Sequence, residues 1–145
     1  MLIRSAVFEK VPGFDERLNL TGGEDALFSA RVNKAGCRIV SSLDAVVFET
    51  VILGRMSVSS ISKRGYQYGS SSVIVYSLLG EKIYTRLFRL VKACVKAFLY
   101  GAYLVPSLVK GRICAVWTLR KISQETGIIL SMLGRRYHPY RNGSK

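Results

Sequence analysis

Two adjacent carboxylates behind a pair of glycines are the strongest candidate for chemistry in this sequence. The run Thr21-Gly22-Gly23-Glu24-Asp25 precedes a stretch of good helix formers that closes at Gly36. Two glycines allow a tight turn and the close approach of another molecule, and a helix N-terminus favours the ionised form of Glu24 and Asp25. A carboxylate so placed can take the proton of an attacking hydroxyl group, which is the work of a general base. A plain helix start without catalytic function is the alternative interpretation.

The elements that must position these carboxylates have an α/β pattern. The stretch Glu24–Ala35 is predicted to be the helix that carries them. Three segments have the composition of short strands: Leu2–Arg4, Arg38–Ser41 and Ala45–Phe48. Residues 1–56 are therefore predicted to be part of an α/β domain, because fifty residues are too few to close such a sheet alone. Residues 57–80 are predicted to connect it, as a helix or a linker, to the rest of the chain.

Charge divides the chain unequally. Of the 145 residues, with a formal net charge of +13, the first fifty hold seven acids and six bases. Residues 51–145 hold sixteen bases and only two acids, Glu81 and Glu125, for a net charge of +14. A near-neutral first third and a basic, apolar remainder predict that the second part meets an anionic surface.

The clearest helix predicted in the chain is Glu81–Leu99. At about 100° per residue, its bases fall within an arc of about 120°, and apolar residues fill the opposite side. The bases are Lys82, Arg86, Arg89, Lys92 and Lys96. This pattern predicts a helix in a membrane interface, with its cations toward anionic head groups and its apolar face among acyl chains. A surface helix packed on a soluble core is the alternative.

Two more segments extend the basic amphipathic region to residues 81–145. Ala97–Val109 is an uncharged run broken by Pro106, and it is shorter than the roughly 20 apolar residues that a membrane span needs. It is predicted to be interfacial or re-entrant. Ile113–Leu133 is a third amphipathic stretch, and its Trp117 suits a membrane interface.

The motifs of the first third, taken together, resemble a known enzyme family. The series Gly13-Phe14-Asp15-Glu16, Gly22-Gly23-Glu24-Asp25, Arg31 and Gly36 resembles the acceptor-side, C-terminal half of the inverting family 2 glycosyltransferases of GT-A fold. The stretch 45–64 and the tail from Gly134 look like the succinoglycan-type branch, which builds bacterial exopolysaccharides. The likeness covers residues 1–70 well and the remainder loosely. It implies an incomplete GT-A, Rossmann-like α/β half followed by amphipathic, membrane-associated helices.

The resemblance implies a role for several residues. Asp25 matches the catalytic base that deprotonates the acceptor sugar, and Glu24 helps to shape the acceptor site, although the two roles could be exchanged. Gly22 and Gly23 belong to the substrate-binding turn. Asp15 is expected to be structural and to hold the loop before the catalytic helix.

Two arginines are candidates for the leaving diphosphate. Arg55 and Arg64 carry guanidinium groups, which suit phosphate oxygens, and plain surface charge is the equal alternative for both. Glu49 stands where many relatives carry a histidine, so the resemblance supports no metal role there.

The donor half of the family is missing from these motifs. In the family, an Asp-x-Asp sequence holds Mg²⁺ or Mn²⁺ on the diphosphate of the nucleotide sugar, and this sequence contains no Asp-x-Asp. The chain is thus expected to be a fragment, inactive alone, of an enzyme that transfers sugar from a nucleotide-sugar donor to a saccharide acceptor, expected to be lipid-linked. No metal site is predicted in the chain itself.

Other classes of protein fit less well. Three isolated cysteines indicate neither a disulfide framework nor a zinc site, and Met1–Lys10 lacks the apolar core of a signal peptide. The expected location is the cytoplasmic face of the plasma membrane. No nucleic-acid partner is predicted, because no nucleic-acid motif is present and the bases lie opposite an apolar face. The alternative function is a basic peripheral membrane protein without catalysis.

Overall fold

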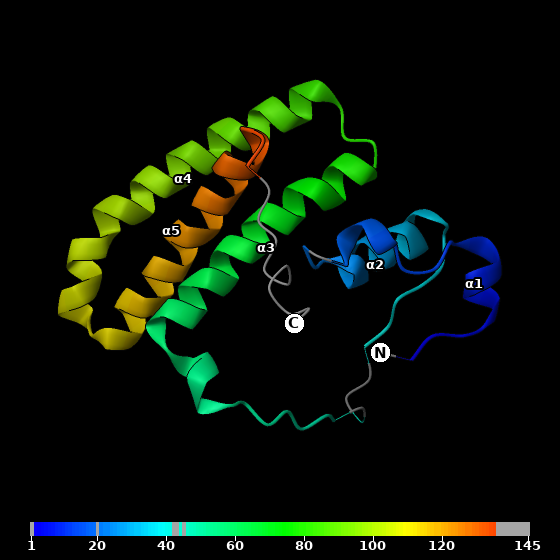
Figure 1. Ribbon diagram of the computed structural model, residues 1–145, viewed down its shortest axis with the longest axis horizontal. Coiled ribbons are helices and arrows are strands. Elements are labelled where there is room, and N and C mark those ends of the chain that lie inside the picture. Colours follow the sequence, from blue (N-terminus) through cyan, green and yellow to red (C-terminus); the bar gives the residue numbers. More distant parts are fainter. Residues whose placement is uncertain (1, 20, 42–43, 45, 136–145) are drawn as a thin grey trace, which may run out of the picture.

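Every regular element of the computed structural model is a helix, within the residues that it describes: 2–19, 21–41, 44 and 46–135 (Figure 1). Five α-helices and two short 3-10 helices follow one another along the chain. They are α1 (Ala6–Lys10), η1 (Glu16–Leu18), α2 (Glu24–Lys34), η2 (Leu53–Met56), α3 (Val58–Leu78), α4 (Ile83–Lys110) and α5 (Arg112–Met132).

The prediction of an α/β, Rossmann-like half is therefore wrong for the described part of the chain. Leu2–Arg4, Arg38–Ser41 and residues 46–48 form no strand there. The side chains of Val40 and Phe48 are 78% and 94% exposed. A strand needs a neighbour that satisfies its backbone hydrogen bonds, and the described residues of these segments pair with no such neighbour.

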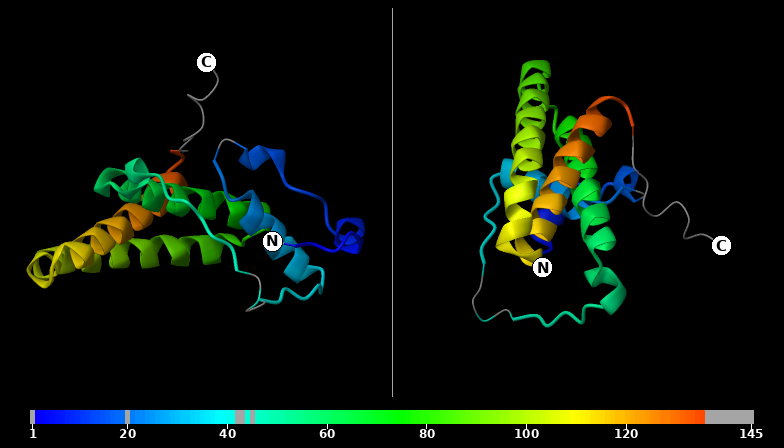
Figure 2. Two further views of the ribbon diagram at one scale, coloured as in Figure 1. Left: turned by 90° about the horizontal axis from the view of Figure 1, so that it is seen from below. Right: turned by 90° about the vertical axis from the view of Figure 1, so that its left-hand side faces the viewer.

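The three long helices form a single layer with α5 in the middle. Figure 1 and the right-hand view of Figure 2 show α3 on one side of α5 and α4 on the other, with α4 antiparallel to both. The antiparallel direction of α4 follows from the connections, because α4 turns back from the end of α3 and α5 turns back from the end of α4, and α5 packs between the other two. As a result α5 has a neighbour on both sides, whereas α4 lies at an edge of the layer.

Glycines set the distance between α3 and α5. A Cβ atom added to Gly69 would lie 2.0 Å from the backbone oxygen of Gln124, and one added to Gly127 would lie 2.3 Å from that of Tyr66. Gly65 has a similar contact, 2.5 Å from the backbone oxygen of Arg120. The two helices therefore touch backbone to backbone, which only residues without a Cβ allow.

The break expected at Pro106 does not occur, because α4 continues past it to Lys110. Pro106 is exposed and stands near the end of the helix, where the loss of one backbone hydrogen bond disturbs little of the structure. In the described part of the chain, no helix is both long and apolar enough to cross a membrane.

A smaller N-terminal unit packs beside the end of α3. Val11, Phe28 and Val32 form one buried cluster. A second cluster joins Leu18 and Leu27 to Val75 of α3. Since Leu27 lies in the first turn of α2, this second cluster fixes the N-terminus of α2 against α3.

Candidate functional site

The candidate site is the turn that leads into α2. Gly22 and Gly23 have φ angles of +75° and +98°, in the left-handed region that favours glycine. A Cβ atom on Gly22 would lie 3.1 Å from Nε2 of Gln67, and one on Gly23 would lie 3.3 Å from Cγ2 of Val75. The turn thus needs both glycines for its backbone conformation and for its close contact with α3.

Buried residues below the turn hold it in place. Leu18 and Leu27 are fully buried. Thr21, which lies between them in the sequence, is also buried. The backbone N–H groups of Thr21 and Gly22 donate to the Leu18 carbonyl at 3.0 and 2.7 Å. The first helical hydrogen bond then runs from Leu27 N–H to the Gly23 carbonyl at 3.0 Å. The turn is therefore a fixed platform for the residues that follow it.

The two carboxylates that follow differ in their surroundings. Asp25 is exposed, and its Oδ1 accepts a hydrogen bond from the Ala26 N–H of its own helix at 2.8 Å. Glu24 is half-buried, and its Oε2 is buried without a hydrogen-bond partner among the described residues. A buried carboxylate oxygen without a donor is costly. The Oε2 atom of Glu24 is thus closed to solvent, while Asp25 is open to it.

The structural role expected of Asp15 is confirmed. Its carboxylate accepts from Arg17 Nε at 2.8 Å and Arg17 Nη2 at 2.7 Å, and from Arg31 Nη2 of α2 at 2.8 Å. The hydrogen bonds from Arg17, together with that from Arg31, hold the pKa of Asp15 well below its usual range, against the opposing effect of desolvation. Asp15 thus ties the η1 turn to the middle of α2, and the charge of Arg31 is paired with that of Asp15.

Arg64 lies on α3 close to Gln67, whereas Arg55 lies outside α3. Arg64 precedes Gln67 by one helical turn and lies within about 60° of it around the α3 axis. Arg55 lies in η2, which precedes the start of α3, and about 14 Å of helix separates that start from Gln67. Both arginines are exposed.

Sequence reasoning missed the part of the site that comes from α3. Gln67 and Ser71 face the glycine turn, and with Val75 they recur at every fourth residue. That spacing indicates a shared helix face, because residues four apart lie on the same side of a helix. The sequence alone did not show that this face exists, because the pattern of residues 57–72 fits either a helix or a linker.

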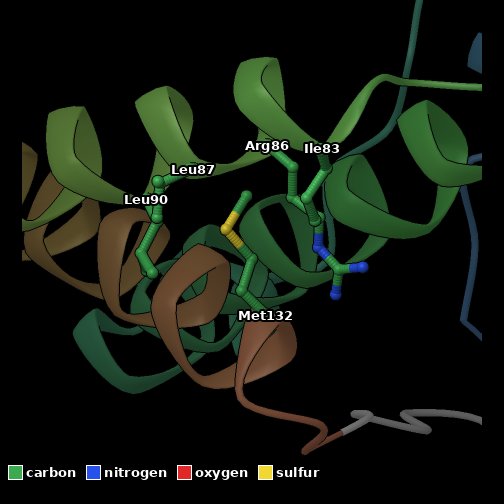
Figure 3. A pocket seen from close by; sticks show the side chains of 5 residues that line it. All are labelled: Ile83, Arg86, Leu87, Leu90 and Met132. Carbon is green, nitrogen blue, oxygen red and sulfur yellow. The ribbon is translucent and has the colours of Figure 1, made fainter.

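Two other kinds of site find no support in the described residues. No three His, Cys, Asp or Glu side chains come together there, so those residues do not fit the Mg²⁺ or Mn²⁺ of the family resemblance. An apolar hollow of about 190 Å³ lies between α4 and α5 (Figure 3). It is smaller than the 300–1,000 Å³ typical of small-molecule sites, and it shares no residue with the glycine turn. It is lined by Ile83, Arg86, Leu87, Leu90 and Met132.

The arrangement can do acid–base chemistry on a bound hydroxyl group. An exposed Asp25 and a half-buried Glu24 offer two carboxylates at a rigid turn. Comparisons with protein-family models, with curated proteins and with solved structures found no match for this chain.

Proposed function

We propose that this chain supplies the acceptor-side part of a family 2 glycosyltransferase of bacterial exopolysaccharide or other cell-surface polysaccharide synthesis. In this role it holds a saccharide acceptor, which receives a sugar from a nucleotide-sugar donor. No contact with a metal ion is assigned to the described residues. The proposed location is the cytoplasmic face of the plasma membrane, where a lipid-linked acceptor and a nucleotide sugar can meet.

The observation that carries the proposal is the position of Asp25 after a turn that only glycines can form. Its carboxylate takes the proton of the acceptor hydroxyl while that oxygen attacks the anomeric carbon, and the nucleoside diphosphate leaves. Glu24, the half-buried carboxylate beside it, helps to shape the acceptor site. Arg64 gives the rim of the site a positive charge that suits the departing diphosphate.

The experiment that tests the proposal is sugar transfer by membranes that contain the complete enzyme. Asp25→Asn should lower the rate by about 100-fold or more, since general-base catalysis contributes about 10²–10⁴. Folding should survive, because the Asp25 side chain is exposed and bonds only to the next backbone N–H. The rate is measured as radiolabelled sugar that passes from the nucleotide sugar into the lipid extract.

The matched control is Asp44→Asn, the same change at an exposed aspartate outside the turn. It should leave the rate of transfer unchanged. Full turnover by Asp25→Asn would remove the assigned role of this carboxylate. If no nucleotide sugar supports transfer by the unaltered enzyme, the alternative of a peripheral membrane protein without catalysis takes its place.

A further inference from the structure

The longest helix of the molecule turns its apolar side outward. Six large apolar residues of α4 fall within an arc of about 120°, and each is more than half exposed. They are Phe88, Val91, Val95, Phe98, Leu99 and Val109. An amphipathic helix of a globular protein normally turns this side to the core, so the orientation of α4 is inverted.

Two bases of α4, Arg89 and Lys96, face the protein instead. The buried residues of α4 are Ala93 and Ser107, and both lie within the arc that holds the bases. Arg89 Nη2 contacts Glu81 Oε1 at 2.6 Å, and its guanidinium lies 3.6 Å from the ring centre of Tyr76. Lys96 Nζ lies 4.0 Å from Glu125 Oε1 of α5.

Both acids of residues 51–145 therefore contact bases on the side of α4 that faces the protein. Glu81 and Glu125 keep only 8% and 7% of their side chains exposed, and each contacts a base of this helix. The prediction that the bases of this helix face anionic head groups is thus wrong for Arg89. Since Arg89 and Lys96 have partners inside the protein, the exposed apolar side of α4 is open to an outer partner.

We infer that the outer face of α4, defined by the six residues above, lies in the interface of an anionic lipid bilayer. The inference rests on the membrane location proposed above but not on the transfer reaction. The helix is about 42 Å long and lies along the bilayer, with its apolar side among the acyl chains.

Charge favours lipid over a second copy of the chain as the occupant. Two chains of net charge +13 repel one another, whereas anionic head groups attract such a chain. Suitable cations stand at one border of the apolar face, where Lys92 and Lys110 follow it at about 20° around the helix axis. Lys110 Nζ also donates to the hydroxyl of Tyr103 at 3.2 Å, on the same border.

The test is co-sedimentation of the full chain with vesicles of phosphatidylcholine containing 30% phosphatidylglycerol. Phe98→Glu puts a charge on the outer face, where the side chain is 76% exposed. It should lower vesicle binding by about tenfold or more, because the aromatic group no longer enters the bilayer. Phe48→Glu makes the same change on a 94% exposed side chain outside α4 and should bind like the unaltered chain.

Several results would overturn the inference. They are equal vesicle binding by Phe98→Glu and the unaltered chain, equal loss in both variants, and no binding by the unaltered chain. A lipid-free dimer that Phe98→Glu dissociates, without vesicle binding, would assign the face to a second copy. Asp25→Asn should bind vesicles normally, so a failure of the transfer reaction is distinguishable from a failure of this inference.

Discussion

The two neighbours of α5 are held in different ways. Against α3, the contact runs through Gly65, Gly69 and Gly127, where added Cβ atoms would lie 2.0–2.5 Å from the opposite backbone. Against α4, the contact includes the small residue Ala93 and a charged pair between Lys96 and Glu125. The contact of α5 with α3 thus depends on close backbone packing, whereas its contact with α4 includes paired charges.

The comparison teaches why the large apolar residues of α4 are left outside. Small residues let helices approach closely without large side chains between them, as Ser70 and Ser107 illustrate on α3 and α4, each nearly fully buried. The layer is therefore built with its bulkiest apolar side chains at its edge. Such a contiguous exposed patch marks an interaction surface.

The largest expected effect is at the close contact of α3 and α5. Gly69→Ala should lower the free energy of unfolding by about 3 kcal/mol or more, because the new methyl group would overlap the Gln124 backbone unless the helices move apart. Urea unfolding followed by circular dichroism measures the change.

The same substitution on α4 is its control. Gly101 has no atom within 4 Å of an added Cβ, so Gly101→Ala should leave the stability unchanged or raise it by up to about 1 kcal/mol. Equal losses in the two variants would show that the contact of α3 with α5 is not set by glycines.

A smaller effect is expected at the charged contact of α4 and α5. Burial raises the pKa of Glu125 above its ordinary value of 4.5, against the opposing effects of Lys96, Lys121 and Lys92. Between the two pKa values the folded chain keeps a proton that the unfolded chain has lost, so this group lowers stability as the pH rises. Glu125→Gln lacks this titration, and its stability relative to the unaltered chain should increase from pH 4.5 upward.

Urea unfolding between pH 4 and pH 8 measures that difference. Glu9→Gln makes the same change at an exposed glutamate of α1 and is the matched control. A difference for Glu125→Gln that stays constant, or that falls with rising pH, would contradict the assignment of Glu125 to a buried contact.

The parts of the fold that depend on local signals could be predicted from the sequence. The helix predicted at Glu24–Ala35 is confirmed as Glu24–Lys34, because a glycine pair and acids begin it and Gly36 follows its end. The glycine turn of the candidate site is equally local. Its other wall was missed, because Gln67 lies more than forty residues away in the sequence and reaches the turn only through the packing of α2 on α3.

The wrong predictions concern features that depend on residues far apart in the sequence. The composition of Arg38–Ser41 indicates a strand, yet a strand exists only with a partner, which no single segment reveals. Similarly, the arcs of α4 follow from residue spacing alone, but spacing does not tell which arc faces the protein. That depends on Glu81 and Glu125, which form ion pairs with Arg89 and Lys96 on the side of α4 that faces the protein.

The central claim, that α4 turns its apolar side to lipid and Arg89 and Lys96 to the protein, can be tested by a spin-label scan. Cys37, Cys94 and Cys114 are first replaced by serine, and single cysteines are then placed from residue 84 to residue 99 in the vesicle-bound chain. Accessibility of the label to oxygen should repeat every 3.6 residues, with maxima at 88, 91, 95 and 98 and minima at 89, 93 and 96. The opposite phase, or the absence of a period, would contradict the account.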